Sequence, residues 1–276
     1  MYLSTVEFEK RGPVAEIRLN RPEKLNAVNA AMVDELNSAL DEAEADENVR
    51  VILLSGNGRA YSAGFDLEMG EADVEMSESE FMAQELKRAF HLIMRFWDCP
   101  IPTIAAVHGY CLGSSMEISA VCDITIATDE CRFGAPEVRF GSGIVCLVLP
   151  WIVGVKNAKE ILLVGSTDID TARALEIGLI NRIVPGSELM AAAHSLADEI
   201  ALNDPLAVRL TKDAIRRSVE IAGMRQALTE ALETDIEIET TETPESKAFN
   251  EILAQDGPKA ALAWRAAKPP DTKIQE

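Results

Sequence analysis

The sequence predicts an α/β fold for roughly the first 185 residues and a helical region after them. Two patterns indicate this. Up to that point, short apolar runs that end in turn residues alternate with segments whose apolar side chains recur at helical spacing. After Pro185-Gly186, only helical patterns remain. With 276 residues, 47% of them hydrophobic, the chain can bury the core of one large domain.

The predicted strands are short and end at turn or proline signals. Residues 14–19 (VAEIRL) roughly alternate between apolar and polar side chains, which is typical of a half-buried strand. Residues 51–54 form a continuous apolar run closed by Ser-Gly-Asn-Gly. The remaining predicted strands cover residues 103–107, 124–127 and 180–184.

Helical spacing predicts helices over residues 29–45 and from Phe81 to Trp97, the second ended by the prolines that follow. Further helices are expected to begin near Gly113, to cover 156–164 with Gly165 after the last turn, and to run from Asp170 to Gly178. The acidic stretch 70–79 is expected to be a mobile loop. The helical tail is expected to break near residues 203–205 and 256–258.

Charge excludes several classes of partner. The chain carries 46 acidic and 26 basic residues, for a net charge of -20. Nucleic acid and anionic membrane surfaces both require clustered cations, so neither is an expected partner. A small ligand that carries phosphate stays possible, because a few local cations or a helix N-terminus can bind it.

The cysteine pattern favours a reducing compartment. The five cysteines are odd in number and none forms a C-x-x-C pair, so the sequence predicts neither a disulfide framework nor a zinc site. The first residues lack the apolar run of a signal peptide, and no stretch is long enough for a membrane span. We therefore expect a cytoplasmic protein with reduced thiols.

Three segments contain candidate functional residues. Residues 61–67 (YSAGFDL) are rich in small side chains, which let the backbone approach another group closely, although an ordinary glycine turn has the same pattern. Residues 133–137 (FGAPE) end in a glutamate after proline, which alone is usually a surface residue. No serine-hydrolase elbow, dinucleotide fingerprint or Walker loop is present, and the three histidines have no metal-ligand spacing.

The third segment, residues 108–117 (HGYCLGSSME), follows a predicted buried strand and opens a helix. Free backbone N–H groups at such a start form an anion site. Glu117 lies three residues after Ser114, on the same helix face, and its side chain leans toward that site. Most helix glutamates are solvated, but the apolar residues that follow Glu117 indicate a buried helix.

Together these segments resemble the enoyl-CoA hydratase/isomerase (crotonase) family. The resemblance covers nearly the whole chain. It rests on the order and spacing of five sequence stretches, namely LNRPEKLNAVN at 19–29, SAGFDL at 62–67, PTIAAVHGY at 102–110, GSSME at 113–117 and FGAPE at 133–137. It implies a crotonase-like spiral of ββα units in residues 1–200 and a helical region in residues 201–276 for trimerisation and closure of the acyl-CoA pocket.

The resemblance also implies an active site. An oxyanion hole would use the backbone N–H groups of Phe65 and Ser114, and two glutamates would act on water. By motif position, Glu117 would be the carboxylate that activates water and Glu137 would supply a proton. No metal or cofactor is implied, because coenzyme A is part of the substrate. The remaining residues expected at the substrate are Lys24, Asn26, Ala27, Val28, Ala63, Gly64, Asp66, Leu67, Gly113 and Val145, with Arg265 and Lys268 as weaker candidates for coenzyme A.

Three departures from the family pattern bear on specificity. Serines follow Gly113 where the family usually has glycines, which a helix start tolerates. Phe65 replaces the usual small residue at the first oxyanion position. The segment 141–147 (GSGIVCL) lacks the proline–glycine step of hydratases, so a more apolar pocket is expected, with the water-positioning backbone group near Val145.

The preferred interpretation is a lyase that adds water in syn geometry to a 2-enoyl-CoA, with a place in fatty acid metabolism and a homotrimeric or hexameric assembly. An enoyl-CoA isomerase, which needs only one proton-shuttling carboxylate, is the first alternative. A thioester hydrolase and a non-catalytic CoA-binding or RNA-binding homologue are the others. The charge of -20 counts against RNA, and the two retained glutamates count against an inactive site.

Overall fold

The computed structural model describes residues 3–67 and 76–267. Its main sheet has the order β1-β2-β3-β4-β6-β9. Strand β1 (Val6–Arg11) pairs with β2 in antiparallel fashion, and every other pair in this sheet is parallel. The other strands of the sheet are β2 (Val14–Leu19), β3 (Val51–Gly56), β4 (Thr103–Val107), β6 (Ile124–Thr128) and β9 (Arg182–Val184).

A second, smaller sheet lies beside the first and has the order β5-β7-β8. It consists of β5 (Tyr110–Leu112), β7 (Arg132–Gly134) and β8 (Ile169–Asp170). Strands β5 and β7 are parallel and in register from Tyr110 with Arg132 to Leu112 with Gly134. Because each strand of this pair leads directly into a candidate segment, the pairing brings residues 113–117 and 135–137 to the same edge.

Helices cover both faces of the main sheet. The helices up to residue 201 are α1 (Ala30–Glu44), α2 (Glu78–Asp98), α3 (Ser114–Val121), α4 (Leu149–Ile152), α5 (Gly154–Val164), α6 (Thr171–Glu176) and α7 (Leu189–Ala201). Short 3₁₀ turns are η1 (Pro22–Lys24), η2 (Glu137–Arg139) and η3 (Gly186–Glu188).

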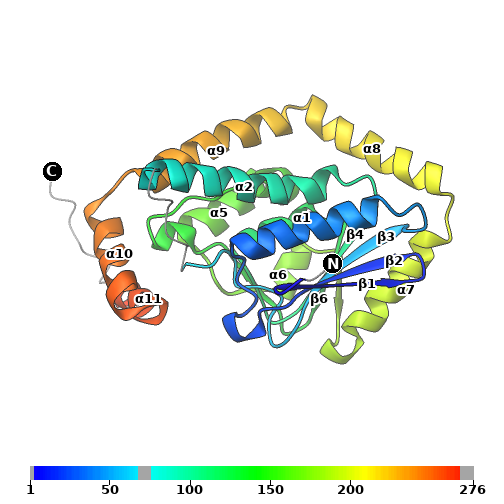
Figure 1. Cartoon of the computed structure of the whole chain (residues 1–276), viewed down its shortest axis with the longest axis horizontal. Coiled ribbons are helices and arrows are strands. Elements are labelled where there is room, and N and C mark those ends of the chain that lie inside the picture. The colour runs from blue at the N-terminus through cyan, green and yellow to red at the C-terminus, as the bar shows by residue number, and fades with distance from the viewer. Residues whose placement is uncertain (1–2, 68–75, 268–276) are drawn as a thin grey trace.

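Alternation along the central strands produces two cores. Leu53 and Ile104 pack on one face with Leu189 and Leu196 of α7, whereas Leu54 contributes to the larger core on the face covered by α1 and α2 (Figure 1). Both faces of the parallel strands are therefore buried, which explains their continuous apolar sequences.

Four helices follow the sheet: α8 (Pro205–Ile221), α9 (Met224–Thr240), α10 (Pro244–Asp256) and α11 (Pro258–Ala266). Helix α9 lies along α2, while α10 and α11 extend at the C-terminal side of the molecule (Figure 1). Helix α8 has no buried residue and exposes Leu206, Leu210, Ile215 and Ile221.

The structure confirms the α/β organisation and most predicted elements. Asn29 caps α1 through its side chain, Asp170 caps α6, and Gly165 ends α5 in the left-handed conformation. The predictions missed β1, the small sheet and the division between α8 and α9 at Gly223. In the loop expected over 70–79, residues 70–75 lie outside the described part, and α2 already begins at Glu78. No described helix is long and apolar enough to cross a membrane.

Candidate active site

The two candidate glutamates lie at the start of α3. Glu117 lies in α3 and is only 1% exposed, and Glu137 is the first residue of η2. A Cβ atom placed on Gly113 would lie 2.5 Å from Oε1 of Glu137, so this carboxyl group rests directly against the start of α3. Parallel pairing of β5 with β7 causes this approach, because Gly113 and Glu137 follow those strands.

The two carboxyl groups differ in their hydrogen bonds. The backbone N–H of Cys146 donates to Oε1 of Glu117 at 2.7 Å. Oε2 of Glu137 is buried and has no hydrogen-bond partner among the described residues. A donor favours the charged form of a carboxyl group, and a missing donor favours the neutral form. The hydrogen bond from Cys146 therefore lowers the pKa of Glu117, against the larger effect of burial.

Burial dominates the titration of both groups. Burial raises the pKa of Glu117 well above its usual range, the charge of Glu137 raises it further, and the Cys146 N–H opposes the shift. Burial also raises the pKa of Glu137 to about 7, with Asp235 and Glu239 adding to the shift and the residue's own N–H opposing it. Two such carboxyls titrate as a coupled pair, and this pair retains at least one proton near neutral pH.

The N–H of Phe65 differs from those of its immediate neighbours. The N–H groups of Ser62, Ala63, Gly64 and Asp66 all donate to acceptors within the protein. Phe65 pairs with Val28 as an isolated bridge, but its N–H has no acceptor among the described residues. The Phe65 N–H, which the resemblance assigns to the oxyanion hole, is therefore available to a ligand.

The N–H of Ser114 is free for a different reason. Ser114 is the first residue of α3, where backbone donors have no partner within the helix. The preceding Gly113 N–H donates to the carbonyl of Gly134 at 2.8 Å, which fixes the entry of the chain. Gly113 has φ 57° and ψ -133°, a conformation that favours glycine. The helix start therefore presents the Ser114 N–H without competition from the described residues.

A pair of buried serines fixes the two segments to each other. Ser115 Oγ donates to Ser62 Oγ, and the N–H of Gly64 lies 3.2 Å from each hydroxyl oxygen. Ser62 Oγ in turn donates to the carbonyl of Asn26 at 2.7 Å. A Cβ on Gly64 would lie 2.9 Å from the carbonyl oxygen of Leu112, so only glycine allows this approach. The serines that replace glycines at 114 and 115 are thus accommodated, and Ser115 stabilises the site.

Asn26 has a structural role in the turn expected to meet coenzyme A. Its buried side chain accepts the N–H of Arg21 at 2.8 Å and donates to the carbonyls of Asn57, Ala60 and Tyr61. Leu25 and Asn26 both have positive φ, so the turn is tightly bent. With its side chain fully engaged, any contact of Asn26 with coenzyme A would come from its backbone.

The other predicted residues surround this centre unevenly. Lys24 is exposed, whereas Ala27 and Val28 are buried and Ala63 is half-buried. Asp66 forms an ion pair with Arg21 at 2.8 Å, and Leu67 is half-buried at the edge of the described segment. Val145 is buried directly before Cys146, so the backbone donor expected near Val145 is the N–H of Cys146, bound to Glu117.

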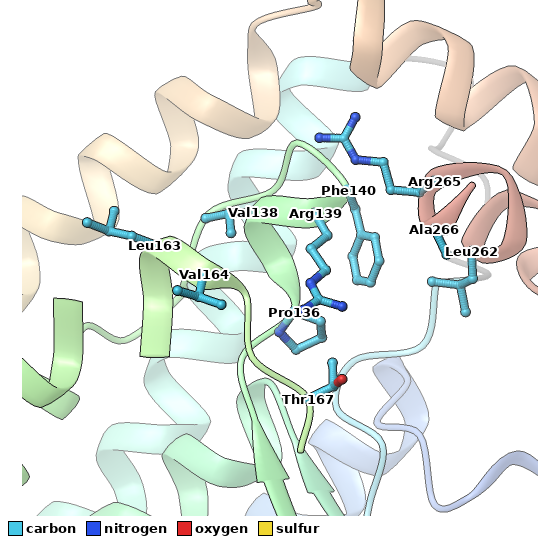
Figure 2. Close-up of a pocket in the computed structure, with 10 residues that line it drawn as sticks. All are labelled: Pro136, Val138, Arg139, Phe140, Leu163, Val164, Thr167, Leu262, Arg265 and Ala266. Carbon is cyan, nitrogen blue, oxygen red and sulfur yellow. The ribbon is translucent and has the colours of Figure 1, made fainter. Parts of the chain in front are cut away.

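Arg265 lines a cavity of about 550 Å³ between η2, α5 and α11 (Figure 2). Arg139 from η2 lines the same cavity, beside the apolar side chains of Val164 and Leu262. Lys268, the other cation proposed for coenzyme A, lies outside the described residues. The other described cavity runs along residues 55–59 and 108–110, where His108 Nε2 contacts the carbonyl of Gly58 at 3.0 Å, a structural role.

Two acidic residues of α9 were missed by the sequence analysis. Asp235 is 2% exposed, and its charge raises the pKa of both Glu117 and Glu137. Glu239, four residues later, lies 3.3 Å from the N–H of Gly143. The available signal was the spacing of Met224, Leu228 and Leu232, which places Asp235 on the buried face of the helix. Among the described residues, no group of acidic, histidine or cysteine side chains could hold a metal ion.

Comparisons with known proteins identify the family of this chain. The family model described as enoyl-CoA hydratase/isomerase matches residues 9–253. The short-chain-enoyl-CoA hydratase of Clostridium acetobutylicum is 35% identical over 270 residues, which cover 95% of this chain and 94% of that protein. The 2,3-dehydroadipyl-CoA hydratase of Escherichia coli is 32% identical over 226 residues, covering 80% and 85%.

Solved structures show the same fold. An enoyl-CoA hydratase/isomerase from Xanthobacter autotrophicus Py2 is 45% identical and superposes with a TM-score of 0.93, covering 98% of this chain and 100% of that one. An enoyl-CoA hydratase from Mycobacterium smegmatis is 27% identical with a TM-score of 0.85, covering 96% and 94%. The chain is therefore an enzyme of the enoyl-CoA hydratase/isomerase family, with the crotonase fold.

Proposed function

We propose that this enzyme adds water in syn geometry across the double bond of a 2-enoyl-CoA thioester. The observation that carries the proposal is the pair of buried carboxyl groups, Glu117 and Glu137, at a helix start whose first N–H is free. Isomerisation requires one proton-shuttling carboxylate, whereas hydration uses a base and an acid. A second carboxyl whose buried Oε2 has no hydrogen-bond partner among the described residues is costly to maintain, and hydration gives it a task.

The proposed reaction assigns one task to each group. The thioester oxygen would accept hydrogen bonds from the N–H groups of Phe65 and Ser114. Glu117 would take a proton from water as the water oxygen bonds to C3, and the electron pair of the double bond would move toward C2 and the thioester oxygen. Donors already aimed at that oxygen stabilise the enolate as charge develops. Glu137 would then give its proton to C2, and a proton transfer between the two carboxyls would restore the starting state.

The acyl group and the coenzyme would occupy different parts of the chain. We expect coenzyme A to lie along the turn at residues 24–28, which the Ser62 hydroxyl ties to the oxyanion segment. Half-buried Phe65 packs against the core beside its own free N–H, so its ring would bound the acyl pocket. The enzyme is expected to work without a metal or redox cofactor, in the cytoplasm, within fatty acid metabolism.

The hydration proposal predicts a specific loss of absorbance. With crotonyl-CoA and longer alkyl or aryl 2-enoyl-CoAs, the conjugated thioester band should decrease, and a 3-hydroxyacyl-CoA should form with one oxygen from labelled water. Butanoyl-CoA is the matched control, because a thioester hydrolase would release coenzyme A from it and a hydratase would not. If no enoyl-CoA gains water while a 3-enoyl-CoA is converted to its 2-enoyl isomer, the enzyme is an isomerase instead.

We also propose a homotrimer or a hexamer. Helix α8 exposes several apolar residues, and so does the end of α5, where Leu163 and Val164 are 75% and 61% exposed. Such patches commonly mark interfaces in soluble proteins. Light scattering of the intact chain is expected to give a mass of three or six copies. A stable monomer at micromolar concentration would exclude this assembly.

A further inference from the structure

Helix α9 carries an acidic residue, Asp235, on its buried and otherwise apolar face. The buried residues of this helix are Met224, Leu228, Leu232 and Asp235, which follow one another at helical spacing. The first three belong to the large apolar core, and Asp235 continues their line. Since α9 lies along α2, this line points into the molecule rather than to solvent (Figure 1).

The carboxyl group of Asp235 is packed against the loop that leads to Cys146. A Cβ on Gly143 would lie 1.9 Å from Oδ1 of Asp235, so the carboxyl occupies the space that any other residue at 143 would fill. Both oxygens of Asp235 are buried without a hydrogen-bond partner among the described residues. Replacing an unpartnered buried carboxyl with an apolar side chain usually stabilises a protein, so its presence requires a functional reason.

No described cation neutralises this group. The cation in the first turn of α9, Arg225, is bound to Asp98 of α2 and to Glu220 of α8. Glu239, on the same face of α9, is held by the N–H of Gly143. Burial raises the pKa of the Cys146 thiol, and the charge of Arg225 also acts on this pKa and lowers it. Among the described residues, no hydrogen bond or ion pair offsets the carboxyl of Asp235.

Three carboxyl groups from three elements thus converge on the start of α3 and the loop at 143–146. Glu117 of α3 accepts the Cys146 N–H, Glu137 of η2 lies against Gly113, and Asp235 of α9 lies against Gly143. Burial raises the pKa of Asp235 to about 7, and the charge of Glu239 raises it further. A charge on Asp235 in turn raises the pKa of Glu137 and of Glu117. Ionisation of any one member therefore opposes ionisation of the others.

We propose that Asp235 is a positioning residue of the active site whose negative charge sets the pH range in which Glu117 and Glu137 together hold a single proton. This inference rests on the proposed function, because one base and one acid are needed only if the pair adds water. Asp235 itself transfers no proton to the substrate. It acts through the pair, which loses its last proton at a higher pH when Asp235 is charged.

The sign of the effect follows from the charge. The pair is active when it holds one proton, so activity rises as the first proton leaves and falls as the second leaves, giving a bell-shaped profile. Asp235→Asn removes the negative charge that holds both protons. Because the pKa of Asp235 is itself about 7, the residue is charged across the alkaline limb and mostly neutral at the acid end. The alkaline limb is therefore expected to move to lower pH, by about one unit for strongly interacting groups, and the acid limb is expected to move less.

The test measures kcat and kcat/KM from pH 5 to pH 10 for the wild type, Asp235→Asn, Asp235→Leu and Asp235→Glu. The asparagine and leucine variants are expected to share the same displacement, because they share only the loss of charge. The glutamate variant restores a carboxyl and is expected to recover the wild-type profile. Glu237→Gln is the matched control, since it removes an exposed charge from the same helix, and its profile is expected to stay in place.

A second measurement needs no turnover and separates this inference from the proposed function. The infrared band of protonated carboxyl groups is followed through a pH titration. In Asp235→Asn, the band of Glu117 and Glu137 is expected to disappear at a lower pH than in the wild type. The Glu137→Gln variant identifies which part of the band belongs to Glu137. A displaced titration in an enzyme that hydrates nothing would support the coupling of the three carboxyl groups and refute hydration. If neither measurement shows a displacement, the proposal is overturned. A rise in KM with an unchanged pH profile would assign Asp235 to substrate contact instead.

Discussion

Glu117→Gln is expected to lower kcat by about 10³-fold, within the range for loss of a general acid or base. The glutamine oxygen can still accept the N–H of Cys146, so the loop that carries Val145 keeps its place. What disappears is the group that takes a proton from water. Because the oxyanion donors and the coenzyme turn are untouched, KM is expected to change much less than kcat.

Stability measurements distinguish this loss from misfolding. The folded-state pKa of Glu117 is raised above its unfolded value, so the wild type has this group's full stability below the unfolded pKa of 4.5 and loses it as pH rises through the folded pKa. Glutamine does not titrate. The variant is therefore expected to melt at a temperature equal to or above that of the wild type at pH 8 while losing activity, a trade common at active sites.

Glu137→Gln provides the comparison within the pair. It is expected to lose at least about 10²-fold in kcat, because the proton for C2 would have no donor. Glu237→Gln, an exposed glutamate of α9, serves as the charge-matched control and should keep full activity. If one glutamate of the pair can be replaced without loss while the other cannot, a single carboxyl carries the chemistry, as isomerisation requires.

The sequence predicted those parts of the site that local patterns encode. Ser114 and Glu117 share a helix face, so their proximity followed from spacing alone. Their approach to Glu137 depends on β5 pairing with β7, strands of three residues each that carry too little periodicity to detect. The Cys146 N–H reaches Glu117 across 29 positions of sequence and Asp235 lies still further along the chain, so only tertiary packing brings them there.

The fold shows the same division. Buried parallel strands such as β4 have continuous apolar sequences that are visible without a structure. Strand β1 (VEFEKR) lies at the sheet edge and is mostly polar, since all five residues after its buried first valine are half-buried or exposed, and it was therefore missed. Gly223 divides α8 from α9 through a left-handed φ of 101°, within a sequence whose helical pattern continues across it.

Ser114→Pro is expected to remove one oxyanion donor and leave the fold intact. Proline has no N–H, but it is favoured at the first position of a helix, where the N–H makes no helical hydrogen bond. Ser114 occupies that position in α3, and the residue before it is a glycine in an extended, positive-φ conformation. The substitution therefore deletes the proposed hydrogen bond to the thioester oxygen, and kcat is expected to fall by about 10²- to 10³-fold.

Ser114→Ala is the matched control. It keeps the backbone N–H and removes only a buried hydroxyl that has no partner among the described residues, so its activity and stability are expected to stay close to those of the wild type. The loss in Ser114→Pro should fall mainly on kcat, because the donor binds the thioester oxygen more strongly as negative charge develops there than in the ground state. If the proline variant kept full activity with an unchanged circular dichroism spectrum, the enolate would have to be stabilised elsewhere. The Phe65 N–H would then act alone or with a neighbouring amide such as that of Ser115. Ser115→Ala retains this N–H but breaks the hydrogen bond to Ser62, so a loss of activity in this variant would show that the Ser115 amide must be held in place.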